Sequence, residues 1–119
     1  NIKFHFDIMH GENNLNKAID LLDEVNKRDF KIYVNSTLYF HPHNMFICKS
    51  KNLLKKYYET IFPWLEKCEK IFKFQKLKGY DLTRIYGFLA ERFLSYWFQK
   101  NAKCKTMNIT FYDIRNDIN

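Results

Sequence analysis

Two long segments in the second half of the chain carry apolar residues at helical spacing. They run from Lys51 to about Lys73 and from Leu82 to about Lys100. In both, the apolar side chains recur every three or four residues, so they share one face of a helix. Ser50 and Asp81 precede the first and second segments and are of residue types that cap helices. Because Pro63 lacks an amide N–H, we expect a kink or a break inside the first segment.

The first third of the chain shows a different pattern. Residues 2–8, IKFHFDI, alternate between apolar and polar side chains, and a period of two predicts a strand with one buried face. Gly11 then marks a turn. Apolar residues recur at helical spacing over residues 14–28 and predict a half-buried helix. Near the other end of the chain, the β-prone run 106–112 predicts a closing strand.

The stretch from Phe40 to Lys49, FHPHNMFICK, joins a turn to a short apolar run. Pro42 fixes its own backbone and favours an extended conformation for the residue before it. Met45 to Cys48 then has the composition of a short buried strand. Together with the other segments, this predicts a mixed α/β fold of short strands flanked by about three main helices, in a single domain over residues 1–119.

The size and charge of the chain restrict its class. A chain of 119 residues is long enough for one domain with one core. The net charge of +7 comes almost entirely from lysine. Lysines scattered over exposed faces usually serve solvation, and the alternative is attraction to lipid headgroups, a phosphorylated ligand or nucleic acid. No RNA- or DNA-binding sequence pattern accompanies the charge, so we expect no nucleic-acid partner.

Several classes of protein are not supported by the sequence. The three cysteines, Cys48, Cys68 and Cys104, stand far apart and form neither a disulfide framework nor a zinc-binding spacing, which favours a reducing cytoplasm. No apolar run is long enough to cross a bilayer. The sequence contains no phosphate-binding P-loop, no dinucleotide-binding glycine pattern, no GxSxG motif and no zinc-deaminase signature.

The turn within FHPHNMFICK supplies the first candidate site residues, His41, His43 and Asn44. Pro42 between the histidines should hold both imidazoles in defined directions. Histidine acts near neutral pH as a base, a metal ligand or a donor to phosphate. The alternative is a rigid turn whose histidines satisfy local backbone groups. No cysteine or carboxylate is adjacent in sequence, so a metal site is not predicted here.

The last helical segment supplies a second group, Arg84, Gly87, Glu91 and Arg92. Glycine inside a helix costs about 1 kcal/mol relative to alanine, so Gly87 suggests a close approach of a ligand or of another backbone. Glu91 has the chemistry of a general base or a hydroxyl acceptor, and either arginine has that of a phosphate or carboxylate ligand. The alternative is an Arg–Glu ion pair that locks the helix to a sheet.

Two further features are interpreted mainly as structural. His10 follows Asp7 and precedes Gly11, at what the alternation predicts to be a strand end, and such a pair also occurs by chance. An aromatic stripe in the first long helix suggests core packing more than a sugar-binding platform. Its members are Tyr57, Tyr58, Phe62 and Trp64.

Three successive motifs resemble those of a bacterial domain of formally unknown function that is found in capsular-polysaccharide and lipopolysaccharide glycosyltransferases. They lie in HPHNMFICK, YYETIFPWLEKCEK and RIYGFLAERFLSYWF. The resemblance covers residues 39–98 and, more weakly, the first third. The third motif is the most specific, because helix packing alone does not require an R-x-x-G-F-x-x-E-R run. The matching positions are Asn44, Met45, Phe46, Ile47, Tyr58, Ile61, Phe62, Pro63, Leu65, Arg84, Gly87, Phe88, Leu89, Glu91, Arg92, Leu94 and Trp97.

The resemblance implies a GT-A-like glycosyltransferase with a nucleotide-sugar donor and an acceptor glycan, in a cytoplasmic setting peripheral to the inner membrane. The chain looks like the C-terminal, acceptor-side part of such an enzyme. Relatives of this kind often hold a divalent cation, Mg²⁺ or Mn²⁺, with a D-x-D element that this sequence lacks. The resemblance favours Glu91 as the catalytic residue and Asn44, Arg84 and Arg92 as substrate-binding residues. His41, His43 and His10 are secondary substrate-binding candidates.

Two other functions remain open from the sequence. One is a non-catalytic basic α/β module that binds an anionic partner, either membrane lipid or nucleic acid. The other is a helical interaction domain that dimerises through its aromatic face. Convergence of Asn44, Arg84 and Glu91 on one accessible site would favour the enzyme, whereas a sealed Arg84 and Glu91 beside one continuous lysine face would favour the binding module.

Overall fold

The computed structural model describes residues 1–111, and every regular element within them is helical. The predicted mixed α/β fold is therefore wrong, because this part of the chain contains no strand. The prediction of a single domain over residues 1–119 extends beyond the described residues and stays a prediction. The elements are α1 (Ile2–His10), α2 (Asn14–Ile19), α3 (Glu24–Ser36), α4 (Lys51–Phe72), the 3-10 turn η1 (Phe74–Lys76), α5 (Tyr80–Thr83) and α6 (Ile85–Asn101).

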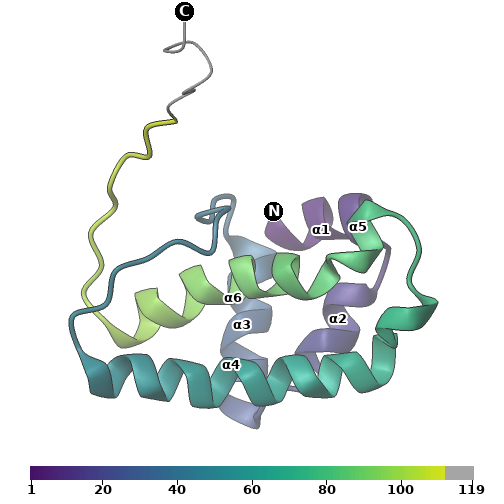
Figure 1. Ribbon diagram of the computed structural model, residues 1–119, viewed down its shortest axis with the longest axis horizontal. Helices are drawn as coiled ribbons and strands as arrows, with labels where there is room; N and C mark the ends of the chain where they lie inside the picture. The colour runs from purple at the N-terminus through teal and green to yellow at the C-terminus, as the bar shows by residue number, and fades with distance from the viewer. Residues whose placement is uncertain (112–119) are drawn as a thin grey trace, which may run out of the picture.

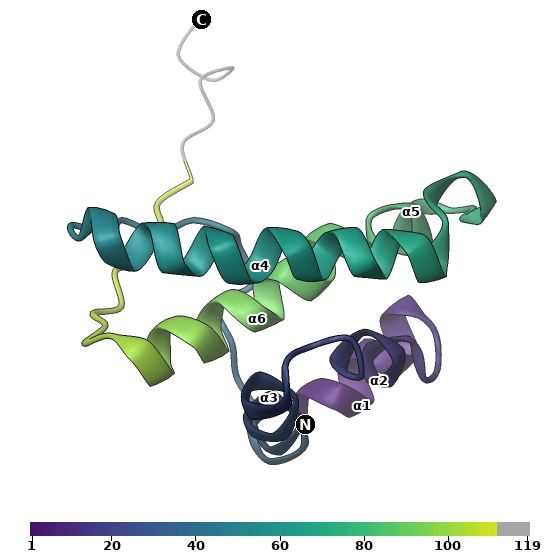
Figure 2. The same ribbon diagram turned by 90° about the horizontal axis from the view of Figure 1, so that it is seen from below.

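The helices are arranged around α6. Figure 2 shows α4 on one side of α6 and the group α1, α2 and α3 on the other. The helices α4 and α6 run in opposite directions, joined by η1 and α5 at one end of the molecule (Figure 1). Because α6 is covered from two sides, about half of its residues are buried. They are Ile85, Leu89, Arg92, Phe93, Leu94, Ser95, Tyr96 and Trp97.

Aromatic rings from α3, α4 and α6 form the centre of the core. The ring of Phe30 lies 5.3 Å from that of Phe93 and 5.0 Å from that of Tyr96, measured between centroids. The ring of Trp64 lies 4.9 Å from Phe93. Trp64 Nε1 also donates a hydrogen bond of 2.7 Å to the carbonyl of Ala18. This buried bond joins α4 to α2 and leaves the indole nitrogen satisfied.

The predicted strand over residues 2–8 is a helix, α1. Ile2, Phe6 and His10 are buried, and their spacing of four residues is that of one helix face. Phe4 and Ile8 complete the alternation in the sequence, but they are exposed. Asn1 caps the helix, since its side chain accepts a hydrogen bond of 2.8 Å from the Phe4 N–H. The alternating pattern arose because apolar residues occupy two different faces of this helix, one buried and one exposed.

The single helix predicted over residues 14–28 is also wrong. The chain forms α2, leaves helical geometry after Asp20 and starts again as α3. Asp23 starts α3 by accepting a hydrogen bond of 3.0 Å from the Asn26 N–H. The new helix then includes the apolar residues Phe30 and Val34 and buries both. An internal N-cap therefore divides one apparent amphipathic segment into two helices.

The segments 37–50 and 102–111 contain no helix or strand. The predicted strands at Met45 to Cys48 and from residue 106 onward are wrong as far as residue 111, because no neighbouring strand lies there to pair with them. Tyr112, the last residue of the predicted closing strand, lies outside the described residues. The segment 37–50 is held instead by side chains such as Phe46, whose ring packs 5.0 Å from that of Phe98.

The two long predicted helices are confirmed as α4 and α6, with corrections. Ser50 caps α4 by accepting from the Leu53 N–H at 3.2 Å. The expected break at Pro63 is absent, and α4 continues through it (Figure 2). Pro63 is exposed and therefore lies on the solvent side of α4, away from the core. Asp81 lies inside α5 and is no cap. Arg84 interrupts the helix before α6.

The packing of α4 corrects the interpretation of its aromatic stripe. Tyr57 and Trp64 belong to the core, as expected, whereas Tyr58 and Phe62 are exposed. These two exposed rings belong to the surface of α4 and not to the core. No helix in residues 1–111 combines the length and apolar character needed to span a membrane.

Candidate functional site

The histidine-bearing turn runs along α6 in the opposite direction. The His41 N–H donates to Ser95 Oγ at 2.9 Å, and Asn44 Nδ2 donates to the Gly87 carbonyl at 3.3 Å. Residues 87 and 95 of a helix are separated by about 12 Å, which an extended segment of a few residues spans. The turn therefore places His43 and Asn44 over the N-terminal half of α6. Figure 1 shows the segment 37–50 following α6 on its way to α4.

Gly87 forms the open part of this surface. A Cβ atom added to Gly87 would meet no other atom within 4 Å. Neither close packing nor a special backbone angle therefore explains a residue that costs about 1 kcal/mol in a helix. Asn44 binds the Gly87 carbonyl, and Glu91 lies one helical turn after Gly87 in α6. We call Asn44, Gly87 and Glu91 the α6 shelf.

Glu91 is the carboxylate of the α6 shelf. Its side chain is 20% exposed, and its Oε2 atom lies 3.6 Å from Arg92 Nη1. Burial raises the pKa of the Glu91 carboxyl above its usual value, while the positive charges of Arg92, His43 and Arg84 act in the opposite direction. A carboxylate that is partly desolvated yet accessible is a better proton acceptor than one in bulk water.

Arg92 is sealed inside the molecule next to Glu91. It is 2% exposed, and its guanidinium lies 5.0 Å from the ring centroid of Phe6 and 4.5 Å from that of Phe40. Nη1 donates to the Phe88 carbonyl at 3.0 Å, and Nη2 lies 3.4 Å from His5 Nδ1. Burial lowers the pKa of the guanidinium to about 10, so Arg92 is charged at neutral pH. Two aromatic faces stabilise this desolvated cation.

His10 completes the sealed pair with Arg92. Its ring stacks on Phe88 with centroids 4.0 Å apart, and Nε2 lies 3.5 Å from Arg92 Nη2. Because arginine only donates, Nε2 must accept, which leaves the proton on Nδ1. Nδ1 lies 4.0 Å from Asp81 Oδ1. Burial and the charge of Arg92 lower the pKa of His10 to about 4, although Asp81 acts in the opposite direction. His10 is therefore neutral at pH 7.

The remaining candidates lie at the surface. Arg84, at the N-terminus of α6, is exposed and donates from Nη1 to the Tyr80 hydroxyl at 3.4 Å. Of the alternative interpretation, an Arg–Glu ion pair that locks the helix to a sheet, only the pair is found: among residues 1–111, Glu91 pairs with Arg92 of the same helix. His41 is exposed, and its Nε2 lies 3.4 Å from Thr106 Oγ1. His43 is also exposed and stands 6.2 Å from the Phe111 ring.

The structure thus divides the candidates into two groups. An accessible group lies along the exposed side of α6, and a sealed group, Arg92 and His10, lies beneath it. Within residues 1–111, no three side chains of His, Cys, Asp or Glu come together as a metal would require, so the expected divalent cation is assigned no ligands. The accessible group consists of Asn44, Arg84, Glu91, His41 and His43.

Three residues of this region were not predicted. Ser95 anchors the turn, His5 contacts Arg92, and Phe40 covers the guanidinium. Ser95 carried a signal, because a hydroxyl stands among apolar residues in the buried stretch of the last helix. His5 carried none, since its contact with Arg92 depends on α1 being a helix. Phe40 was noted only as the first residue of the turn.

Comparison with known proteins gives one match. A family model described as "Domain of unknown function (DUF4422)" matches residues 1–102, which include every α-helix of the structure. No curated protein and no solved structure matches the chain.

Proposed function

The chain belongs to the DUF4422 family, and we propose that it is the acceptor-side part of a glycosyltransferase. The enzyme would transfer a sugar from a nucleotide-sugar donor to a growing capsular or cell-surface polysaccharide. The family itself has no assigned activity. The support for the proposal is the resemblance of the three motifs and, above all, the position of Glu91 on the α6 shelf.

Glu91 has the environment that a general base needs. It is accessible, its pKa is raised by burial, and the position beside it, Gly87, is uncovered. Asn44 adds hydrogen-bonding capacity, because Nδ2 carries a second hydrogen and Oδ1 is an acceptor. A carboxylate and an amide near an open backbone position suit a sugar ring, which presents several hydroxyl groups at once.

In the proposed reaction, an acceptor hydroxyl donates a hydrogen bond to Glu91. The hydroxyl oxygen forms a bond with the anomeric carbon of the donor as the bond from that carbon to the nucleoside diphosphate breaks. The proton passes to the Glu91 carboxylate. The diphosphate leaves with additional negative charge, which an exposed cation such as Arg84 would stabilise.

The proposal gives Arg92 and His10 a positioning role. Both are almost completely buried, so neither contacts a substrate in this arrangement. Arg92 lies 3.6 Å from the Glu91 carboxylate and is itself fixed by Phe6, Phe40 and the Phe88 carbonyl. Holding the carboxylate beside a fixed cation restricts its orientation toward the acceptor.

We propose the cytoplasm as the setting. The described residues contain three unpaired cysteines, Cys48, Cys68 and Cys104, and one of these, Cys104, is exposed. Exposed thiols persist unpaired in a reducing compartment. The divalent cation that such donors often need would be a further partner, held by groups other than a cluster in residues 1–111.

The test is sugar transfer by the complete gene product, assayed over a panel of nucleotide sugars with cell-surface glycans as acceptors. We expect turnover with one donor and a loss of about 100-fold or more in Glu91→Gln. Glu66→Gln is the matched control, because Glu66 is an exposed glutamate on α4, away from the α6 shelf.

The two variants also need a stability measurement. We expect both to unfold within about 1 kcal/mol of the wild type, since neither glutamate is part of the core. Equal activity in Glu91→Gln and wild type would remove Glu91 from the mechanism. Unfolding of Glu91→Gln would instead show that Glu91 is a structural residue, and the assignment of the site would fail.

A further inference from the structure

Charge is distributed unevenly between the two outer layers of the molecule. Residues 1–36, which form α1, α2 and α3, contain five lysine or arginine and six aspartate or glutamate residues, a net charge of −1. Residues 49–78, which form α4 and η1, contain nine lysines and three glutamates, a net charge of +6. Since these layers lie on opposite sides of α6 (Figure 2), the molecule has one strongly basic side.

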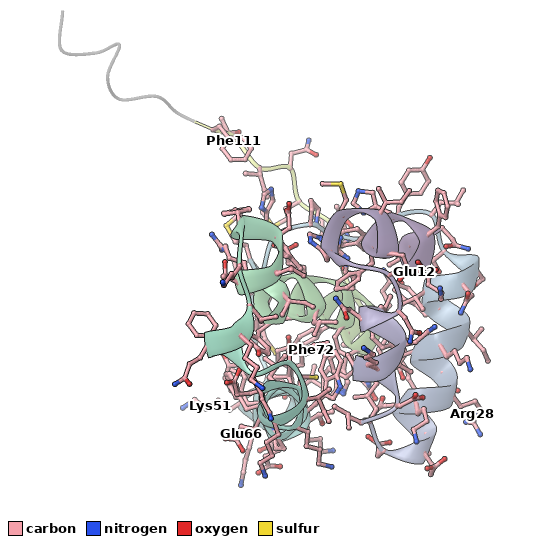
Figure 3. The ribbon with its side chains drawn as sticks, turned by 90° about the vertical axis from the view of Figure 1, so that its right-hand side faces the viewer. Glu12, Arg28, Lys51, Glu66, Phe72 and Phe111 are labelled. Atoms are coloured by element: carbon pink, nitrogen blue, oxygen red, sulfur yellow. The ribbon has the colours of Figure 1, made fainter. Side chains whose placement is uncertain are left out.

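The lysines of the basic side point into solvent. All nine are exposed, and within residues 1–111 only Lys55 has a carboxylate within 4 Å, that of Glu59 at 3.8 Å. Figure 3 shows Lys51 and Glu66 on the outer side of α4, with Arg28 at the opposite side of the molecule. The nine are Lys49, Lys51, Lys55, Lys56, Lys67, Lys70, Lys73, Lys76 and Lys78.

Large aromatic side chains are exposed beside these lysines. Tyr58 is 41% and Phe62 is 55% exposed. Their rings are neighbours, with centroids 5.3 Å apart. They line a shallow groove along α4 together with Lys51, Leu54, Lys55, Glu59, Pro63 and Glu66. We call Tyr58, Phe62 and the nine lysines the α4 outer face.

We propose that the α4 outer face docks on a bilayer that contains anionic phospholipids. The apolar face of α4 is buried in the core, so the membrane contact would be made by its exposed lysines and by the rings of Tyr58 and Phe62, residue types that favour a membrane interface. The lysines meet the lipid phosphates, and the apolar side chains enter the boundary between headgroups and acyl chains.

Lipid fits this surface better than nucleic acid does. A polyphosphate backbone would neutralise the lysines, but no nucleic-acid-binding sequence pattern accompanies them. Glu59, Glu66 and Glu69 also lie exposed on α4 and interrupt the positive surface. A membrane interface tolerates such interruptions, because lipids move laterally and arrange their charges around the protein. This inference does not depend on the proposed transferase activity.

The test is co-sedimentation of the protein with vesicles of phosphatidylcholine alone and of phosphatidylcholine mixed with phosphatidylglycerol. We expect binding only to the mixed vesicles, and weaker binding at high salt. Replacing Lys67, Lys70 and Lys73 with glutamine should lower the affinity on the order of ten-fold or more. Phe62→Ser should lower it as well, and its effect should persist at high salt because the lost contact is apolar.

A second triple variant is the matched control. Lys17, Lys27 and Lys31 lie in α2 and α3, on the opposite layer, and replacing them with glutamine removes the same charge. We expect this variant to bind vesicles like the wild type. Equal losses in both triple variants would show that net charge alone matters, and the docking face would be wrong.

Two other results would overturn the proposal. One is sedimentation with neutral and anionic vesicles to the same extent, or with neither. The other is tight binding to a duplex oligonucleotide that anionic vesicles do not displace, which would identify nucleic acid as the partner. Circular dichroism of each variant must match the wild type; all substituted lysines except the half-buried Lys27 are exposed and none is in the core, so folding should be retained.

Discussion

Glu91 and Arg92 are neighbours in sequence, yet the structure uses them in opposite ways. Glu91 lies on the accessible α6 shelf, whereas Arg92 lies beneath it between two aromatic rings. Successive residues of a helix point about 100° apart, so one helix position separates the surface from the core. A charged pair in a motif thus does not define two substrate contacts, because burial assigns one of the two to the scaffold.

The energetic consequences of the two positions differ. Removing Arg92 would leave a gap between Phe6 and Phe40 and would deprive the Phe88 carbonyl of its additional donor. Removing the charge of Glu91 would leave a partly exposed amide that water can reach. The sealed pair of Arg92 and His10 should therefore govern stability, and the α6 shelf should govern ligand chemistry.

The largest expected effect is that of Arg92→Ala, which should lower the free energy of unfolding by about 4 kcal/mol, measured by urea denaturation. The cause is the loss of a buried, hydrogen-bonded cation and its packing. Arg84→Ala is the control, since Arg84 is exposed, and it should change stability by about 0.5 kcal/mol. Similar effects from both arginines would contradict the division between a sealed pair and an open shelf.

The second prediction concerns the pH dependence of stability. The pKa of His10 is about 4 in the folded protein, lowered from the ordinary value of 6.5 that the unfolded chain has. The unfolded chain therefore binds more protons between these values, and stability falls as pH drops from about 6.5 to about 4. The loss should be on the order of 3 kcal/mol.

Replacement of His10 isolates this contribution. The variant His10→Gln keeps a polar side chain of similar size but does not titrate. Its free energy of unfolding should therefore depend much less on pH between pH 6.5 and pH 4. The measurement is urea denaturation across this range. An unchanged slope in the variant would mean that His10 does not remain neutral in the core.

The smallest expected effect is that of Gly87→Ala. The added methyl group meets no atom within 4 Å, so the variant should gain the helix propensity of alanine, about 1 kcal/mol. Gly11→Ala is the contrasting variant, because Gly11 has a φ of 97° and its Cβ would collide with Asn14. It should destabilise the protein. A loss of stability in Gly87→Ala would show that the shelf is not open.

The sequence predicted the helices in the second half of the fold correctly, whereas its predictions for the first half were wrong. The spacing of apolar residues over more than four turns left only one interpretation for α4 and α6. In α1, apolar residues on two helix faces produced a false period of two, and only the packing of Ile2 and Phe6 against the core distinguishes the faces. Asp23 divides α2 from α3 through a local cap that the apolar pattern conceals.

The candidate site, too, was predicted from the sequence only in part. Asn44, Gly87 and Glu91 were identified from the motifs, and the structure joins Asn44 to Gly87 by a hydrogen bond, one helical turn before Glu91. The burial of Arg92 was not predictable, because it depends on Phe6 and Phe40, which lie more than fifty positions away in the sequence. Long-range contacts of this kind leave no local pattern.

The most direct test of the central claim fills the α6 shelf without touching the sealed pair. Gly87→Leu places a bulky side chain on the α6 shelf, at a position where an added Cβ meets no other atom within 4 Å. We expect an unfolding free energy within about 1 kcal/mol of the wild type and a loss of sugar transfer of about 100-fold, because the acceptor is excluded. A stable variant with unchanged transfer would show that the shelf is not the site.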